Sequence, residues 1–210
     1  MFDKKFKLEA NQISYFRDNH KIVNALSFKI QAGCLLQIVG PNGVGKTTLL
    51  RILTGLLQPD EGTIYCDGAP IHQQLDDYQK KIFYLDHIIA VKPQLKAIEN
   101  ILYDSALALT SKDQALAALA RFNLEACAEQ LTGQLSRGQK QRLALCKMLC
   151  SSASLYLLDE PFTALDDSGV AITQQVLLEF LEKGRAIILS SHRLLSLAHS
   201  MTTLALGESE

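Results

Sequence analysis

The sequence has almost no net charge. Its 210 residues include 21 basic and 22 acidic side chains, which gives a formal net charge of −1. This balance gives no support for bulk electrostatic binding to nucleic acid or to an anionic lipid surface. The chain also lacks internal repeats and low-complexity segments. Its length fits one domain with at most a small lobe attached.

Long apolar runs are missing as well. The longest, such as CLLQIVG and SLYLLD, are far too short to span a membrane. The first ten residues, MFDKKFKLEA, carry charges but no apolar segment typical of a secretory signal. The five cysteines include no C-x-x-C pair, which favours reduced, buried cysteine over a disulfide or a metal site. We therefore expect a cytoplasmic protein that does not itself cross the membrane.

Short apolar segments separated by turn residues predict strands in the N-terminal part, namely FKLEANQIS, ALSFKI, CLLQIVG and GTIYCDG. A helix is expected over about residues 46–57, and residues 92–150 are mainly helical by composition. SLYLLD and RAIILSS are buried strands on either side of an amphipathic helix. This order predicts an α/β protein with a parallel sheet covered on both faces, an antiparallel N-terminal β lobe and a helical insertion.

The glycine-rich segment GPNGVGKTT follows an apolar strand and opens a helix. It matches G-x-x-x-x-G-K-[ST] in the context that this phosphate-binding motif requires. Glycines let the backbone wrap a phosphate, while the amides and the helix dipole supply positive potential. Lys46 is expected to contact the β- and γ-phosphates of a nucleotide, and the Thr47 hydroxyl to ligate Mg²⁺. The expected phosphate-binding residues are Gly40, Pro41, Asn42, Gly43, Val44, Gly45, Lys46, Thr47 and Thr48.

Two adjacent acids, Asp159 and Glu160, follow the apolar strand LYLL. Paired acids at the C-terminal end of a buried strand occupy the edge of the sheet where α/β proteins place their chemistry. We expect Asp159 to hold Mg²⁺ through water, and Glu160 to orient or deprotonate the attacking water.

The segment LSRGQKQR, residues 135–142, has two interpretations. Ser136 is either the cap of a surface helix with solvated charges, or part of a helix N-terminus that is aimed at an anion. These eight residues leave both interpretations open.

The phosphate loop, LSRGQ, LYLLDEP, TALD and SSH occur in this order along the chain. Together they resemble the ATP-binding-cassette (ABC) ATPases, and the resemblance covers nearly the whole chain. It implies a P-loop NTPase fold with a RecA-like core. It also implies a β lobe plus ATPase core over about residues 1–86 and 151–210, and a helical subdomain over about 87–150. Hydrolysis of Mg²⁺-bound ATP coupled to transport is the implied activity.

In this family two cassettes pack head to tail, and each signature motif closes on the γ-phosphate of ATP held by the other chain. The resemblance therefore implies that Ser136, Gly138 and Gln139 contact the nucleotide of a second subunit. Arg137 stands where the family most often has glycine.

Further single residues of this sequence match functional positions of the family. Asp166 in TALD matches an aspartate at the dimer seam, and His192 in LSSH matches a catalytic histidine near the γ-phosphate. An aromatic residue that stacks on adenine is expected near SYFRDN. Tyr15 is the first choice there and Phe16 the second.

One position departs from the common pattern. His87 follows the strand IFYLD where most cassettes have a glutamine that ligates Mg²⁺. The surrounding run is similar to the ATP-binding subunit of the cytochrome c maturation (haem exporter) transporter, which also has histidine there. That subfamily implies integral-membrane partner subunits, a peripheral location on the inner face of the cell membrane, and a catalytic role for His87. A soluble ABC ATPase, for example in iron–sulfur assembly, and a nucleotide-binding module that does not hydrolyse ATP are the alternatives.

Overall fold

The computed structural model describes residues 6–87, 89–104, 110–192, 195 and 201–207. The chain divides into two compact units. The first, here called the core unit, consists of Met1–Tyr84, Ala153–Glu160 and Leu177–Glu210. The second, the helical unit, consists of Leu85–Ser152 and Pro161–Val176.

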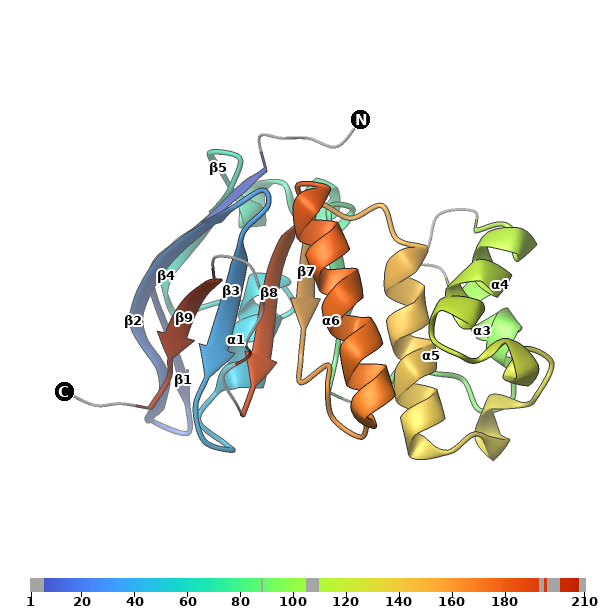
Figure 1. Ribbon diagram of the computed structural model, residues 1–210. Helices are drawn as coiled ribbons and strands as arrows, with labels where there is room; N and C mark the ends of the chain where they lie inside the picture. Colours follow the sequence, from blue (N-terminus) through green and yellow to red (C-terminus); the bar gives the residue numbers. More distant parts are fainter. Residues whose placement is uncertain (1–5, 88, 105–109, 193–194, 196–200, 208–210) are drawn as a thin grey trace. The chain divides into compact units, whose positions relative to one another are not determined.

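An antiparallel sheet forms one part of the core unit (Figure 1). Its strands are β1 (Lys7–Arg17), β2 (His20–Gln31), β4 (Glu61–Cys66) and β5 (Ala69–Pro70), in the order β2-β1-β4-β5. Asp18 and Asn19 join β1 to β2 with φ values of 49° and 62°, as a two-residue hairpin turn requires. The antiparallel N-terminal β lobe predicted from the sequence is confirmed.

The second sheet of the core unit has the order β6-β7-β8-β3-β9. It consists of β3 (Leu35–Val39), β6 (Ile82–Leu85), β7 (Leu155–Leu158), β8 (Ala186–Ser191) and β9 (Met201–Ala205). The pairs β7–β8, β8–β3 and β3–β9 are parallel. The predicted parallel sheet is confirmed, although β9 is not among the strands expected from the sequence. The carboxyl ends of β3, β7 and β8 therefore reach the same edge of the sheet, and the residues that follow them become neighbours.

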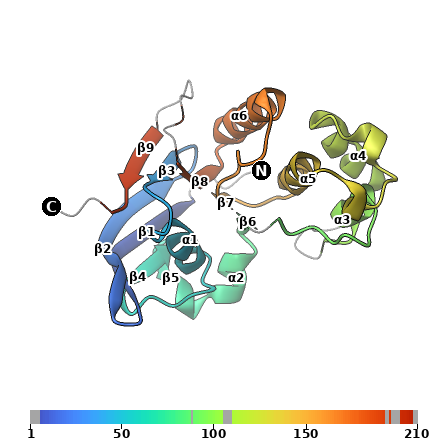
Figure 2. The ribbon, with the colours of Figure 1, turned by 90° about the horizontal axis from the view of Figure 1, so that it is seen from below.

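Helix α1 (Lys46–Leu53) packs against both sheets of the core unit. Its buried side chains, such as Leu50, belong to one apolar cluster with Ile13 of β1 and Ile38 of β3. Figure 2 shows α1 and α2 (Leu75–Gln79) beside the strands of this unit. The opposite face of β7 carries Tyr156, whose ring centroid lies 4.7 Å from that of Phe180.

The predicted end of the first helix, near residue 57, is wrong. The helix ends at Leu53, because the Thr54 hydroxyl donates to the Arg51 carbonyl at 2.8 Å and Gly55 turns the backbone with φ of 77°. A glycine at this position commonly ends a helix.

The helical unit contains α3 (Ala97–Leu102), α4 (Lys112–Arg121), α5 (Arg137–Leu149) and the first part of α6 (Asp167–Glu182). Short 3₁₀ turns, η2 (Glu125–Cys127) and η3 (Thr132–Gln134), connect α4 to α5, and a third, η1 (Ile71–Gln73), lies in the core unit. The Asn100 side chain is buried and bonds Thr132 Oγ1 at 2.8 Å. Within the described ranges, no helix combines the length and apolar character needed to cross a membrane.

Replacing Tyr78 by Phe is expected to destabilise the core unit. The buried Tyr78 hydroxyl donates to the Leu53 carbonyl at the end of α1, at 2.5 Å, and burial raises the pKa of this phenol. Loss of the hydroxyl leaves a buried carbonyl without this donor, which costs about 1–3 kcal/mol. Urea unfolding measures the change. Tyr65→Phe in β4, at a partly exposed position, is the matched control with an expected effect below about 0.5 kcal/mol. Equal stability losses in the two variants would contradict the prediction.

Candidate functional site

The phosphate-binding segment Gly40–Thr48 runs from the end of β3 into the first turn of α1 in the core unit. Gly45 precedes the helix with φ of 106°, and a Cβ atom there would lie 2.7 Å from Ile22 Cγ2. The loop therefore needs glycine at this position both for its backbone conformation and for space. The nearly buried Lys46 folds over the loop, where its Nζ donates to the carbonyls of Gly40 at 2.7 Å and Pro41 at 3.0 Å. The Lys46 ammonium group and the N-terminus of α1 therefore both lie at this loop, and both favour the binding of an anion.

Asp159 lies at the centre of the polar cluster beside this loop. Its carboxylate is buried and accepts a hydrogen bond from Thr47 Oγ1 at 2.6 Å and another from Ser190 Oγ at 2.5 Å. Thr47 is in the first turn of α1, Asp159 follows β7, and Ser190 is near the end of β8. The two hydroxyl donors compensate for the desolvation of the buried carboxylate.

Glu160 is held next to this carboxylate. Its amide donates to Ser190 Oγ at 2.9 Å, and its backbone has φ of 50°, in the left-handed region. Its Oε1 lies 2.7 Å from His192 Nε2 and 3.9 Å from Lys46 Nζ. The structure therefore brings together Lys46, Glu160 and His192, which the sequence analysis selects from three separate segments.

Oxygen ligands suited to Mg²⁺ are present at one point of this cluster. The Thr47 hydroxyl and the Asp159 carboxylate are hard donors of the kind that Mg²⁺ prefers. No group of three or more His, Cys, Asp or Glu side chains that could hold a metal ion occurs among the described residues. The two side chains fit a magnesium ion that takes its other ligands from phosphate and water.

The segment LSRGQ, residues 135–139 and here called the signature segment, leads into α5 in the helical unit. Ser136 caps this helix by accepting from the Gln139 amide at 3.2 Å, while the Gln139 side chain accepts from the Ser136 amide at 2.8 Å. The cap expected at Ser136 is therefore present, and it does not exclude the anion interpretation. A hollow of about 490 Å³ lies at this helix start, lined by Ser136, Gly138, Gln139, Arg142, Ala164 and Asp166.

Three further residues are candidates from the sequence. His87 is exposed just after β6. The Tyr15 ring is partly buried and packs against the apolar cluster of the core unit. Phe16 is 39% exposed, and Lys21 Nζ lies 5.5 Å from the centre of its ring.

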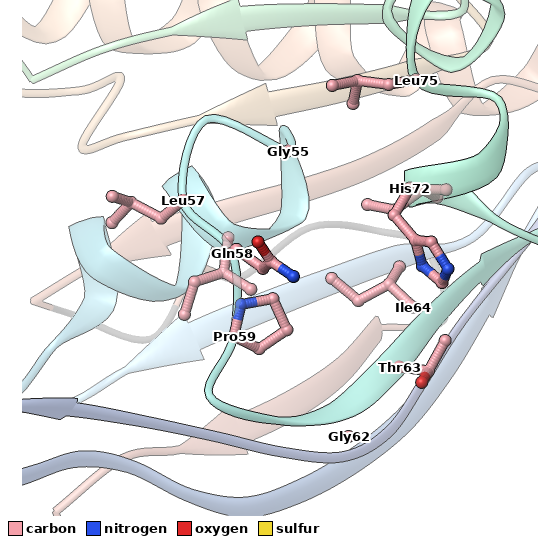
Figure 3. Close-up of a pocket in the computed structure, with 11 residues that line it drawn as sticks. Gly55, Leu57, Gln58, Pro59, Gly62, Thr63, Ile64, His72 and Leu75 are labelled. Atoms are coloured by element: carbon pink, nitrogen blue, oxygen red, sulfur yellow. The ribbon is translucent and has the colours of Figure 1, made fainter.

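Another hollow of about 280 Å³ occurs in the core unit, beyond the C-terminal end of α1 (Figure 3). Apolar side chains such as Leu57, Ile64 and Leu75 line it, and His72 is on its wall. None of the side chains of the phosphate-loop cluster lines this hollow.

Sequence reasoning missed two residues of these clusters. Ser190 lies inside LSSH and Arg142 inside LSRGQKQR, so both belong to segments with a recognised motif. Neither has a signal of its own, because each acts through a partner that is distant in sequence: Ser190 bonds Asp159, and Arg142 pairs with Asp166.

A phosphate loop after β3, paired acids after β7 and the capped helix α5 that follows LSRGQ together define an ATP-binding cassette. The family model described as ABC transporter matches residues 23–163. The chain belongs to this family, and it is an ATP-binding, ATP-hydrolysing subunit.

Individual relatives agree with this assignment. The chain is 41% identical to the cytochrome c biogenesis ATP-binding export protein CcmA of Idiomarina loihiensis, over 91% of this chain and 88% of the relative. It is 40% identical to the Escherichia coli K12 protein of the same name, over 92% of each.

Solved structures of ABC proteins share the fold. A putative ABC transporter ATP-binding protein from Pyrococcus furiosus has a TM-score of 0.83 and 27% identity, over 95% of this chain and 97% of that one. A dimeric cassette in a post-hydrolysis state, bound to ADP and Pi, has a TM-score of 0.78 and 26% identity, over 89% of this chain and 88% of that one.

Replacing Ser190 by Ala is expected to lower both stability and turnover. The change removes one donor from Asp159 and the acceptor of the Glu160 amide. We expect a loss of about 1–3 kcal/mol in unfolding free energy and about a tenfold fall in kcat, the equivalent of about 1.4 kcal/mol in the barrier. Denaturant unfolding and steady-state ATPase assays measure the two effects.

Ser14→Ala is the matched control for this variant. It also removes a fully buried hydroxyl, which accepts from the Ala25 amide in the β lobe at 3.0 Å. It should lower stability without lowering kcat. A Ser190→Ala protein with the kcat of the control would show that Ser190 has no part in orienting the acids.

Proposed function

We propose that this chain hydrolyses ATP to drive integral-membrane partner subunits in cytochrome c biogenesis, as part of a haem exporter. The relatives at 40–41% identity over about nine tenths of the chain carry names that state export and cytochrome c biogenesis. His87 also supports this proposal. The haem-exporter subfamily has histidine at this position, whereas most cassettes have glutamine. A peripheral location on the inner face of the cell membrane follows from a membrane-embedded partner that takes ATP from the cytoplasm.

The observation that carries the chemistry is the placement of the Glu160 carboxylate between Lys46 and His192. Lys46 and the loop amides bind the phosphates of ATP and hold the γ-phosphate at the carboxyl edge of the sheet. Glu160 orients a water beside that phosphate and accepts its proton. His192 Nε2, 2.7 Å from Glu160 Oε1, holds the carboxylate in place beside the position proposed for the γ-phosphate.

Thr47 and Asp159 are the residues that would hold Mg²⁺, Thr47 directly and Asp159 through water. A magnesium ion there would neutralise charge on the phosphate oxygens. The strand ends supply the rest of the arrangement, because Ser190 fixes both acids by hydrogen bonds.

A complete active site is proposed to need two chains packed head to tail. In this arrangement Ser136, Gly138 and Gln139 of one chain contact the γ-phosphate bound to the other, and Asp166 lies at the seam. The hollow at the start of α5 supports this assignment, since these residues surround it on an accessible face. The solved cassette that is dimeric in its ADP- and Pi-bound state supports it too.

Between the two candidates for adenine stacking, the exposure of the rings favours Phe16. Its ring is 39% exposed, whereas the Tyr15 ring packs against the apolar cluster. An aromatic face that is open to solvent can stack on a base without disturbing the core.

Glu160→Gln is the experiment that tests the proposed chemistry. The amide keeps the size of the carboxylate but cannot accept a proton from water. We expect ATP affinity to stay within about twofold, while kcat falls by about 10²- to 10⁴-fold. The variant should accumulate as an ATP-bound dimer, which gel filtration with Mg·ATP detects.

Glu182→Gln, an exposed position near the end of α6, is the control and should behave as wild type. Normal hydrolysis by Glu160→Gln would exclude Glu160 as the residue that activates water. Loss of ATP binding in the same variant would show that Glu160 is needed for the nucleotide and not for the water.

His87 is proposed to act without binding the metal directly, because Mg²⁺ prefers oxygen to a neutral imidazole nitrogen. His87→Gln should retain at least part of the ATPase activity, since the amide oxygen is the ligand that most cassettes use. His87→Ala should lose more, chiefly in the assembly with membrane subunits. Steady-state ATPase of the chain alone and of the detergent-solubilised complex compares the two.

His72→Ala, at another exposed histidine, is the control for this series and should match wild type in both settings. Wild-type activity of His87→Ala in both settings would leave His87 without a mechanistic role.

A further inference from the structure

The beginning of α5 and the segment Ala164–Asp166 are tied together inside the helical unit. Arg142 lies one turn after Gly138 on α5, and its guanidinium forms an ion pair with Asp166 Oδ1. Arg142 lies in the second turn of α5, and Asp166 directly precedes α6; both helices are labelled in Figure 1. Both side chains line the hollow that Ser136 and Gly138 also line.

Asp166 also has a local role that does not need Arg142. Its Oδ1 accepts from the Gly169 amide at 2.9 Å, so the side chain caps α6. The bond from Gly169, followed by the guanidinium of Arg142, holds the pKa of Asp166 below its ordinary value. The carboxylate is 63% exposed, and an exposed ion pair adds little to stability. Stability alone therefore does not account for a nearly buried arginine that reaches across to a capping residue.

The backbone beside this pair is tightly fitted. A Cβ atom at Gly138 would lie 2.9 Å from the Ala164 carbonyl oxygen, so only glycine lets the segment approach α5 this closely. Ala164 itself has φ of 63°, a left-handed conformation that is unfavourable for alanine. Such a conformation persists only where the surroundings enforce it, and the Arg142–Asp166 pair is part of those surroundings.

We propose that Arg142 is a positioning residue for ATP hydrolysis in the dimer. It holds Asp166 against α5. As a result Asp166, Ser136 and Gly138 meet the nucleotide of the second chain as one rigid group. This inference rests on the proposed head-to-tail function of Ser136, Gly138 and Asp166. Arg142 does not touch the nucleotide. It acts through Asp166 and through the Ala164 backbone, and it is required only when two chains assemble.

The test uses the full chain with Arg142→Gln, Arg142→Lys and the control Lys140→Gln. Lys140 is on the same helix, and its Nζ bonds the Gly133 carbonyl at 3.2 Å. Arg142→Gln should lower kcat by about ten- to a hundredfold, as expected when one charge-assisted hydrogen bond of the reacting state is lost. Fluorescent-ATP affinity of the monomer should stay within about twofold of wild type. The control should match wild type in all three measurements: kcat, affinity and thermal midpoint.

Two further comparisons separate positioning from folding. Arg142→Lys should recover part of kcat, because lysine restores the charge without the planar fork. The double variant Arg142→Gln, Asp166→Asn should be no slower than the slower single variant, since residues that act as one unit are not additive. A fall in thermal midpoint and in monomer ATP affinity that parallels the loss of kcat would overturn the proposal, as would wild-type kcat in Arg142→Gln.

Dimer formation distinguishes this inference from the function on which it rests. Glu160→Gln should give an ATP-bound dimer on gel filtration, and adding Arg142→Gln should reduce that dimer about tenfold or more at the same ATP concentration. If Glu160→Gln forms no dimer, the proposed head-to-tail function fails, and this inference fails with it. If the single and double variants dimerise equally, the function stands and the positioning role of Arg142 is overturned.

Discussion

The buried carboxylate of Asp159 is the constraint on which the active edge of the core unit depends. A buried charge costs several kcal/mol unless it is paired or hydrogen-bonded. Here the compensating donors are the hydroxyls of Thr47 and Ser190, which come from segments 112 and 31 residues away. The same bonds that make the carboxylate tolerable fix the start of α1, the end of β7 and the end of β8 in one place. A strand order of β7-β8-β3 is what allows three distant segments to meet there.

Glu160 shows how this constraint passes to the neighbouring acid. Its backbone takes a left-handed conformation, which is unfavourable for a non-glycine residue by about 1–2 kcal/mol. The hydrogen bond from its amide to Ser190 Oγ helps to hold that conformation. As a result the side chain leaves the strand in the direction of Lys46 and His192. Ser190 therefore serves both acids, although no motif singles it out.

Contiguous patterns are enough to predict most of the fold and the nucleotide loop. GPNGVGKTT and LYLLDEP carry their meaning in neighbouring residues, because strand ends, glycine spacing and helix starts are local properties. The sequence pattern extends α1 too far, because the apolar residues Leu56 and Leu57 follow Gly55 and conceal the turn. The Arg142–Asp166 pair and the close approach of Gly138 to Ala164 are beyond prediction, since they depend on how two helix starts pack in three dimensions.

Lys46 connects the chemistry proposed for this edge to the binding of the nucleotide. Its nearly buried cation is balanced by the neutral carbonyls of Gly40 and Pro41, while Glu160 is 3.9 Å away. Phosphate oxygens make stronger, charge-assisted bonds to an ammonium group than carbonyls do, so a phosphate in the loop competes successfully for Lys46. The attraction between Lys46 and Glu160 weakens when a second anion shares the cation, whereas the contact of Glu160 with His192 does not involve the loop. Under the proposed function, binding of ATP would turn Glu160 from a partner of Lys46 into a carboxylate available to water, and one side chain would link substrate binding to water activation.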